Sequence, residues 1–152
     1  NTSRHHGAVV DLTPTFAGMA ASVKRTVELD KNDYLLVTDH IVAGAKPTKV
    51  EWRMATNAEA EIIAPNIIQL TQEGKTMYLR LRTRAVSDAV IWSDHQYKEY
   101  EERDANLRRV GFVLDLRAGE VVDVEVTLSA ERGKKGISLP KINLGLGKKN
   151  RR

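Results

Sequence analysis

Three arginines spaced two residues apart are the side chains in this sequence best suited to bind an anion. Arg80, Arg82 and Arg84 occur in KTMYLRLRTRA, and on a β-strand this spacing turns all three guanidinium groups to one face. Guanidinium groups match the geometry of oxyanions, so the three arginines are candidate contacts for a polyanion, such as an acidic glycan. We favour a solvated or domain-covered surface instead, because Asp123 and Glu125 share the spacing and would pair with the arginines on an adjacent strand.

Tryptophan side chains can stack on sugar rings, and the sequence contains two of them. Trp52 alternates in phase with Val50 and Met54, which predicts that it lies in the hydrophobic core. Trp92 is in phase with Val90, and the alternation leaves open which side of the strand the two occupy. Trp92 is therefore the better candidate for a glycan contact.

No arrangement of residues in the sequence indicates catalysis, a metal or a cofactor within this chain. There is no cysteine, no serine in a Gly-x-Ser-x-Gly turn and no glycine loop of the P-loop type. His5 and His6 are adjacent, but neighbours on a strand point to opposite faces, which makes them poor joint ligands. His40 and His95 have no neighbour that makes a catalytic role specific. We expect no catalytic residue, no metal and no cofactor here.

The positive charge of the chain is concentrated at its C-terminal end. The 152 residues include 24 Lys and Arg against 20 Asp and Glu, a net charge of +4. Residues 129–152 hold eight Lys or Arg and one acid, a balance of +7, so the other 128 residues carry 4 − 7 = −3. A mildly acidic body argues against nucleic acid as a partner, and no apolar run is long enough to predict a membrane span. We expect residues 1–128 to form a single domain and residues 129–152 a basic, partly disordered tail.

Short runs of alternating apolar residues recur every eight to twelve residues and are separated by polar or glycine-containing turns. This spacing predicts an all-β fold, an antiparallel β-sandwich. Only residues 97–107 have a helix-like composition, which suits a charged loop equally well. We expect strands near 8–12, 21–30, 34–43, 48–56, 59–63, 66–72, 76–86, 88–93, 108–116 and 121–128.

The sequence specifies the register of three hairpins, the first of them between 21–30 and 34–43. A three-residue turn at 31–33 would place Leu29 opposite Leu35, and the same count sets Arg25 opposite Asp39. Both charges lie on the otherwise apolar face, where each would be costly to bury alone. We expect a structural ion pair rather than a functional site, because buried charges are usually paired.

Two further hairpins follow from their turn residues. A turn at residues 73–74 places Leu70 opposite Met77 and directs the three arginines outward. A turn near 118–120 would pair Leu116 with Val122 and make the last two strands a hairpin.

Six stretches occur in an order and spacing that fit a known family across about residues 8–128. They are VVDLTPTFAG (9–18), SVKRTVELD (22–30), LLVTDHIVA (35–43), VEWRMAT (50–56), LTQEGKTMYL (70–79) and RRVGFVLDLRAGE (108–120). Together they resemble the C-terminal β-sheet domain of the heparinase II/III family of polysaccharide lyases. Their succession is more specific than any one of them.

The resemblance implies a domain that packs against the N-terminal helical catalytic domain of the same polypeptide and lines its glycan cleft. Such enzymes cleave acidic, uronate-containing polysaccharides by β-elimination, in the periplasm or outside the cell. Most catalytic groups of the family lie on the helical domain, so we expect the parent protein to be a lyase and this chain alone to be inactive. Zinc-binding members have a histidine where this sequence has Met54 and Ala55, so no zinc ligand is carried over. The alternative is a stand-alone module that binds carbohydrate or protein.

Overall fold

Within residues 5–30, 34–92 and 106–130, which a computed structural model describes, the chain forms ten β-strands and one short 3-10 helix. The elements are β1 (His5–Asp11), η1 (Thr13–Phe16), β2 (Ala20–Asp30), β3 (Leu35–Ala43), β4 (Thr48–Thr56), β5 (Glu59–Ala64), β6 (Ile67–Gln72), β7 (Lys75–Arg82), β8 (Val86–Trp92), β9 (Arg108–Leu116) and β10 (Val121–Ser129). Each predicted strand corresponds to one of these, which confirms the all-β prediction.

One strand prediction is wrong at its end. The strand expected over 76–86 stops at Arg82, and β8 begins after a break. Within the break, the Thr83 hydroxyl accepts a hydrogen bond from Ala85 N–H (3.3 Å), a local turn that competes with the sheet ladder. Arg84 therefore lies in a bend and not on one strand with Arg80 and Arg82. The helix-like segment 97–107 falls almost wholly outside the described residues.

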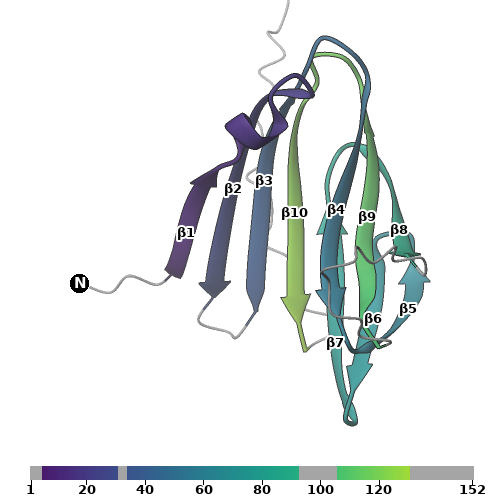
Figure 1. The fold of residues 1–152 in the computed structure, drawn as a ribbon. Coiled ribbons are helices and arrows are strands. Elements are labelled where there is room, and N and C mark those ends of the chain that lie inside the picture. The colour runs from purple at the N-terminus through teal and green to yellow at the C-terminus, as the bar shows by residue number, and fades with distance from the viewer. Residues whose placement is uncertain (1–4, 31–33, 93–105, 131–152) are drawn as a thin grey trace, which may run out of the picture.

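The strands form two antiparallel sheets of unequal width (Figure 1). The larger sheet has seven strands in the order β1-β2-β3-β10-β7-β6-β5, and the smaller has three in the order β4-β9-β8. Alternate residues of both sheets point into the space between them, which makes the fold the predicted antiparallel β-sandwich. Its most buried side chains are Phe112, Ile68, Leu79, Leu114, Val110, Val124 and Val126.

The hairpin of β2 and β3 has the predicted register. Leu29 lies opposite Leu35, and Arg25 lies opposite Asp39. The three-residue turn expected at 31–33 lies outside the described residues. Because directly opposed residues share a face, the register alone brings the two charges together on the inner side of the larger sheet.

The hairpin of β6 and β7 also follows the prediction, with Leu70 opposite Met77. The turn between the strands has Glu73 at φ 51° and Gly74 at φ 75°. Two consecutive positive φ angles are typical of a type I′ turn, whose twist matches that of a two-stranded ribbon. The glycine supplies one of these angles without a steric cost.

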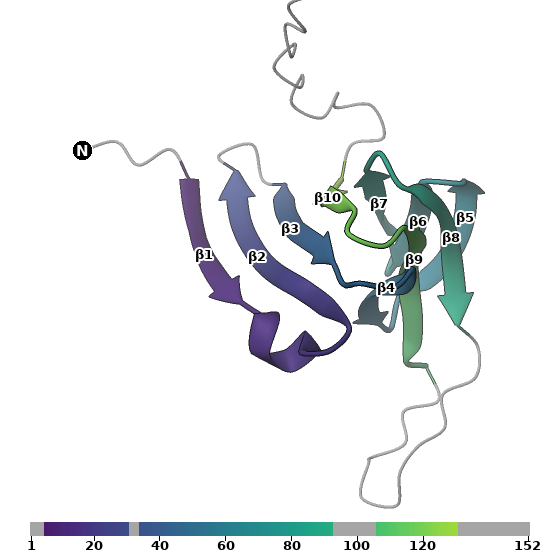
Figure 2. The ribbon, with the colours of Figure 1, turned by 90° about the horizontal axis from the view of Figure 1, so that it is seen from above.

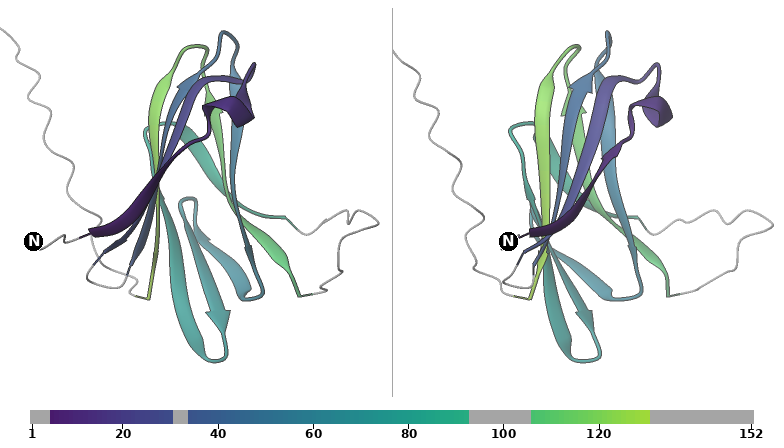
Figure 3. Two further views of the ribbon diagram at one scale, coloured as in Figure 1. Left: turned by 60° about the vertical axis from the view of Figure 1, so that its left-hand side comes forward. Right: turned by 90° about the vertical axis from the view of Figure 1, so that its left-hand side faces the viewer.

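The third predicted hairpin is wrong, because β9 and β10 belong to different sheets. The turn at 117–120 is an arch that crosses from the smaller sheet to the larger one, and the β3–β4 connection crosses beside it. Gly119 N–H donates to Gly44 O over 2.9 Å and joins the two arches, which lie at the same end of the sandwich (Figure 3). Leu116 and Val122 are therefore both buried in the core, but on facing sheets rather than on paired strands.

The sandwich is closed along one side and open along the other. On the closed side, Ala89 N–H on β8 donates to Pro65 O in the β5–β6 turn over 2.8 Å, and Arg108 Nη1 donates to Ala58 O over 3.2 Å. On the open side, β1 and the part of β2 that follows Arg25 extend past β4, and no layer of the described residues covers their inner faces (Figure 2). The larger sheet thus presents a partly uncovered inner surface.

Candidate functional site

Arg80 and Arg82 lie on β7 and point to the outer face of the larger sheet, since the residues that alternate with them are buried. Arg82 Nε donates to Glu125 Oε2 on the neighbouring β10 over 2.8 Å, in the register that sets the two residues opposite each other. Asp123, the other acid expected to face the arginines, instead lies 2.8 Å from His40 Nδ1 on β3. Cross-strand pairing therefore occupies Arg82.

Trp92 ends β8 on the outer face of the smaller sheet, the same face as Val90 and Gly111. Arg53 on β4 reaches across Gly111 of β9, and its guanidinium carbon lies 4.7 Å from the centroid of the Trp92 ring. Arg53 also forms an ion pair with Glu51 on its own strand. The ring is thus part of a cation–π stack on the outer face of the smaller sheet.

The four predicted glycan contacts are not brought together. Arg84 stands in the bend after β7, and the guanidinium carbon of Arg80 lies 5.7 Å from the ring centroid of Tyr78. Trp92 is on the opposite side of the sandwich from Arg80 and Arg82, because the two outer faces are separated by the core. One glycan chain bound flat on either sheet contacts only one of these groups.

The two charges expected to pair on the inner face form a bidentate contact. Arg25 Nε donates to Asp39 Oδ1 over 2.6 Å, and Nη2 donates to Oδ2 over 2.7 Å. The Asp39 side chain is 5% exposed and that of Arg25 36%, so the pair lies where the core meets the open side. Hydrogen bonding to Asp39 raises the pKa of Arg25 against the opposing effect of burial, which keeps the guanidinium charged. The result is a fixed polar point on an apolar surface.

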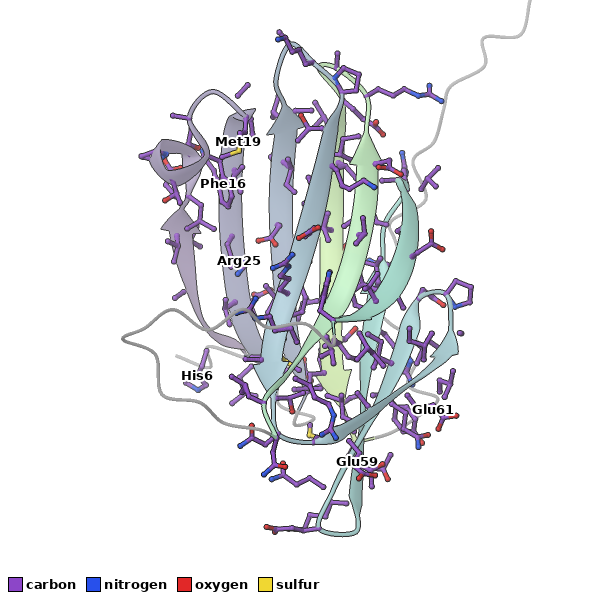
Figure 4. All side chains as sticks on the ribbon, turned by 45° about the vertical axis from the view of Figure 1, so that its right-hand side comes forward. His6, Phe16, Met19, Arg25, Glu59 and Glu61 are labelled. Atoms are coloured by element: carbon purple, nitrogen blue, oxygen red, sulfur yellow. The ribbon has the colours of Figure 1, made fainter. Side chains whose placement is uncertain are left out.

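A pocket of about 210 Å³ opens beside this ion pair. It lies between η1, the inner faces of β2 and β3, and the edge strand β4. Phe16 and Met19 line it and remain 37% and 55% exposed, so they form its rim. Figure 4 shows Phe16 and Met19 above Arg25 on one side of the molecule, with Glu59 and Glu61 of β5 on the other. The pocket thus lies on the open side, between these rim residues and the ion pair.

Trp52 forms part of the pocket wall and lies in the core, as its phase predicted. The centroid of its ring lies 6.5 Å from that of Phe112, and the Arg25 guanidinium carbon lies 6.0 Å from the centroid of the indole ring. The indole Nε1 is buried and has no hydrogen-bond partner among the described residues. An unpaired buried donor costs about 1–3 kcal/mol, which the surrounding packing has to offset.

The histidines give no sign of a metal site. His6 is exposed on β1, at the end away from η1 (Figure 4), and His95 lies outside the described residues. Within residues 5–30, 34–92 and 106–130, no group of three His, Asp or Glu lies close enough to hold a metal ion. The same part of the chain has no helix with the length and apolar character needed to cross a membrane.

Two features of the surface did not follow from the sequence. Gly111 was the available signal for the Arg53–Trp92 stack, because a glycine inside a strand of bulky residues marks a close backbone approach. The pocket has no comparable signal. It depends on how far the larger sheet extends past the smaller one, and that is set by contacts between residues far apart in the sequence.

Comparison with solved structures finds the same fold within a larger protein. Two solved structures of a heparinase III gene product, one of them with methylated lysines, each match 86% of this chain with a TM-score of 0.60 and 14% sequence identity. The chain spans 20% of the length of that protein. No protein-family model matches this sequence, and no curated protein matches it. At this identity, the comparison establishes a shared fold.

Proposed function

We propose that this chain is the β-sandwich domain of a polysaccharide lyase of the heparinase type. In this proposal it packs against a helical catalytic domain of the same polypeptide and lines one wall of the glycan cleft. The whole enzyme would cleave acidic, uronate-containing polysaccharides by β-elimination, in the periplasm or outside the cell. The sandwich itself would supply shape and position rather than reacting groups.

The observation that carries this proposal is the inner face of β1 and of β2 after Arg25, which none of the residues that the structure describes covers. Val10 and Leu29 point to the inner side and are 45% and 51% exposed. Around them lie half-buried apolar residues such as Val27 and Val37. Apolar groups on the core side of a sheet gain about 25 cal/mol per Å² when a second layer covers them. A second domain on this face would complete the half-covered sandwich.

β-Elimination requires several groups that act together, whereas the described part of this face holds an ion pair and a histidine, His6, opposite Leu29. A base removes the proton next to the uronate carboxylate, polar partners neutralise that carboxylate, and an acid protonates the leaving oxygen. On the inner face of the described strands, Arg25 and Asp39 already satisfy each other. The proposal therefore assigns the reacting groups to the partner domain and a supporting role to this one.

Lysine substitutions on β1 and β2 test the docking role. In the gene product that carries this chain, Val10→Lys and Leu29→Lys should lower elimination turnover at least tenfold. Each would place a charge on the face that the catalytic domain covers in this proposal. Val9→Lys is the matched control, since Val9 neighbours Val10, points to the outer face and is 73% exposed. Turnover is followed by the absorbance of unsaturated uronate on a panel of acidic glycans, with a neutral glucan as blank.

Equal turnover in all three variants would remove the inner face as a docking surface. Absence of any elimination product from every acidic glycan, in a protein with native thermal unfolding, would remove the lyase assignment itself.

A second function, that of a stand-alone carbohydrate-binding module, is favoured by the Trp92–Arg53 stack. An aromatic ring and a cation lie together on the outer face of the smaller sheet, which suits a sugar ring bearing a carboxylate. The same face carries Glu51, which pairs with Arg53 and reduces the positive charge available to a ligand. For this reason we rank this function second.

Variants of the predicted glycan contacts distinguish the two functions. If the domain acts by docking, Trp92→Ala and the triple variant Arg80→Ser, Arg82→Ser, Arg84→Ser should each change glycan turnover less than about twofold. The triple variant should also lower the free energy of unfolding by less than about 1 kcal/mol, because the Arg82–Glu125 pair is partly exposed. A tenfold loss of turnover or of glycan binding in either variant, with unchanged thermal unfolding, would locate glycan recognition on that outer face.

A further inference from the structure

The pocket beside β4 has a mostly hydrocarbon wall. Leu12, Phe16, Met19, Val23, Trp52 and Leu116 contribute to it, from η1, β2, β4 and β9 and the segments around η1. Phe16 and Met19 at the rim are apolar yet exposed, and a methionine adapts its shape to an incoming group more easily than a branched side chain does. Such a wall selects an apolar occupant.

One polar group at the pocket has donors to spare. Arg25 uses Nε and Nη2 to hold Asp39, whereas its Nη1 donates to none of the residues that the structure describes. The bidentate contact fixes the plane of the guanidinium, so the direction of the remaining N–H groups is fixed as well. Arg25 also lines the pocket, so an acceptor oxygen of an occupant is within reach of this guanidinium.

The size of the pocket favours a single side chain over a sugar chain. Pockets that bury a small-molecule ligand usually enclose about 300 to 1,000 Å³, and this one encloses about 210 Å³. A single large aliphatic or aromatic side chain fits that space. Anchors of this kind, one side chain seated in a desolvated pocket, dominate the affinity of many protein interfaces.

The charge balance of the pocket disfavours an anionic occupant. Lys49 and Glu51 also line the pocket, and each has a partner of opposite charge, Asp115 and Arg53. Asp39 neutralises Arg25, and its carboxylate would repel a carboxylate or sulfate placed against the same guanidinium. A neutral backbone carbonyl makes the same hydrogen bond without that repulsion. The acceptor that fits best is therefore a peptide group.

We propose that this pocket is an anchor site, which takes one large aliphatic or aromatic side chain of a partner polypeptide segment while a backbone carbonyl of that segment accepts a hydrogen bond from Arg25 Nη1. The assignment deepens the docking role proposed above, and it rests on that role in placing the segment on the adjoining domain. The site lies on the open side of the sandwich, next to the face that carries Val10 and Leu29.

Capped amino acids test the anchor site on the 152-residue chain by itself. We expect N-acetyl-leucinamide and N-acetyl-phenylalaninamide to shift the NMR signals of the Trp52 indole N–H and the Val23 amide, with dissociation constants of about 1 to 10 mM. N-acetyl-alaninamide should bind at least tenfold more weakly. 3-Methyl-1-butanol, which has a leucine-like side chain but no carbonyl, should bind at least threefold more weakly than the leucinamide.

Two variants and a control make the test specific. Ala20→Leu fills the pocket from its wall and should weaken leucinamide binding at least tenfold. Met19→Ala removes part of the rim of the pocket and should weaken leucinamide binding about threefold. Because Met19 is exposed, this substitution does not endanger folding. Val9→Ala, on the outer face, should leave binding unchanged.

Several outcomes would overturn the anchor site: shifts that do not saturate with any amide, unchanged affinity in both pocket variants, or tighter binding of glucuronate or acetate than of leucinamide. Equal affinity for the alcohol and the amide would overturn the carbonyl contact with Arg25. Because no glycan and no second domain take part, these results are independent of the lyase assay with the lysine variants.

Discussion

Replacing Arg25 by methionine is expected to lower the free energy of unfolding by about 3 to 5 kcal/mol, the range seen when one partner of a buried ion pair is removed. The reason is the unequal burial of the pair, since the side chain of Asp39 is only 5% exposed. Without Arg25 its carboxylate stays on the inner face with neither of the two hydrogen bonds that now satisfy it. Thermal unfolding should show a fall in Tm of about 10 °C.

The converse variant should be milder, and the double variant milder still. Asp39→Leu leaves a guanidinium that is 36% exposed and can turn toward water, so we expect a loss of about 1 to 2 kcal/mol. Combining Arg25→Met with Asp39→Leu leaves no unpaired charge, and its unfolding free energy should return to within about 1 kcal/mol of the parent chain. Urea unfolding of the parent chain, the two single variants and the double variant completes a double-mutant cycle. A double variant as unstable as Arg25→Met would show that the two side chains act through packing and not as a pair.

The pairing of Arg25 with Asp39 could be predicted because it depends only on local information. A strand has a side-chain period of two, so the length of one turn fixes which residues of a hairpin face each other. The apolar alternation on both strands allows one register, and that register sets the two charges on the core side. The same reasoning placed Leu70 opposite Met77 across a turn whose glycine identifies its type.

The connection between β9 and β10 could not be predicted from the same kind of pattern. Both strands alternate buried and exposed residues around a short glycine-containing turn, which is what a hairpin requires. Two strands on facing sheets of a sandwich also direct alternate residues into one core, so an arch and a hairpin give the same alternation. An arch and a hairpin differ in which strands form hydrogen bonds with each other. Here β10 pairs with β3 and β7.

The same limit explains the candidate sites. The prediction of a row of three arginines required one uninterrupted strand. A single hydroxyl contact at Thr83 ends that strand early. The pocket beside Arg25 arises because seven strands face three, and a sheet's width is a property of the whole topology. Sequence patterns on single strands therefore identified the polar pair but not the cavity next to it.

Substitution of Gly111 by alanine should be as damaging as the loss of Arg25, for a reason confined to the backbone. A Cβ atom at this position would lie 1.9 Å from the carbonyl oxygen of Trp52, whereas real Cβ atoms essentially never approach within 3.0 Å. To relieve the clash β4 has to move away from β9 by about 1 Å, which weakens a nine-residue ladder and the packing of Trp52 on Phe112. We expect the free energy of unfolding to fall by about 3 kcal/mol or more.

Gly119→Ala is the matched control, because it makes the same chemical change where space is free. Nothing lies within 4 Å of a Cβ at this position, and only its φ of +67° is unfavourable, at a cost of about 1–2 kcal/mol. If Gly119→Ala lowers the free energy of unfolding more than Gly111→Ala does, β4 can move away from β9 at little cost. In that case the pocket wall would not be rigid, because β4 carries Trp52 and forms one side of the pocket. The urea midpoints of these two glycine variants therefore measure how firmly the edge of the proposed anchor site is held before any partner binds.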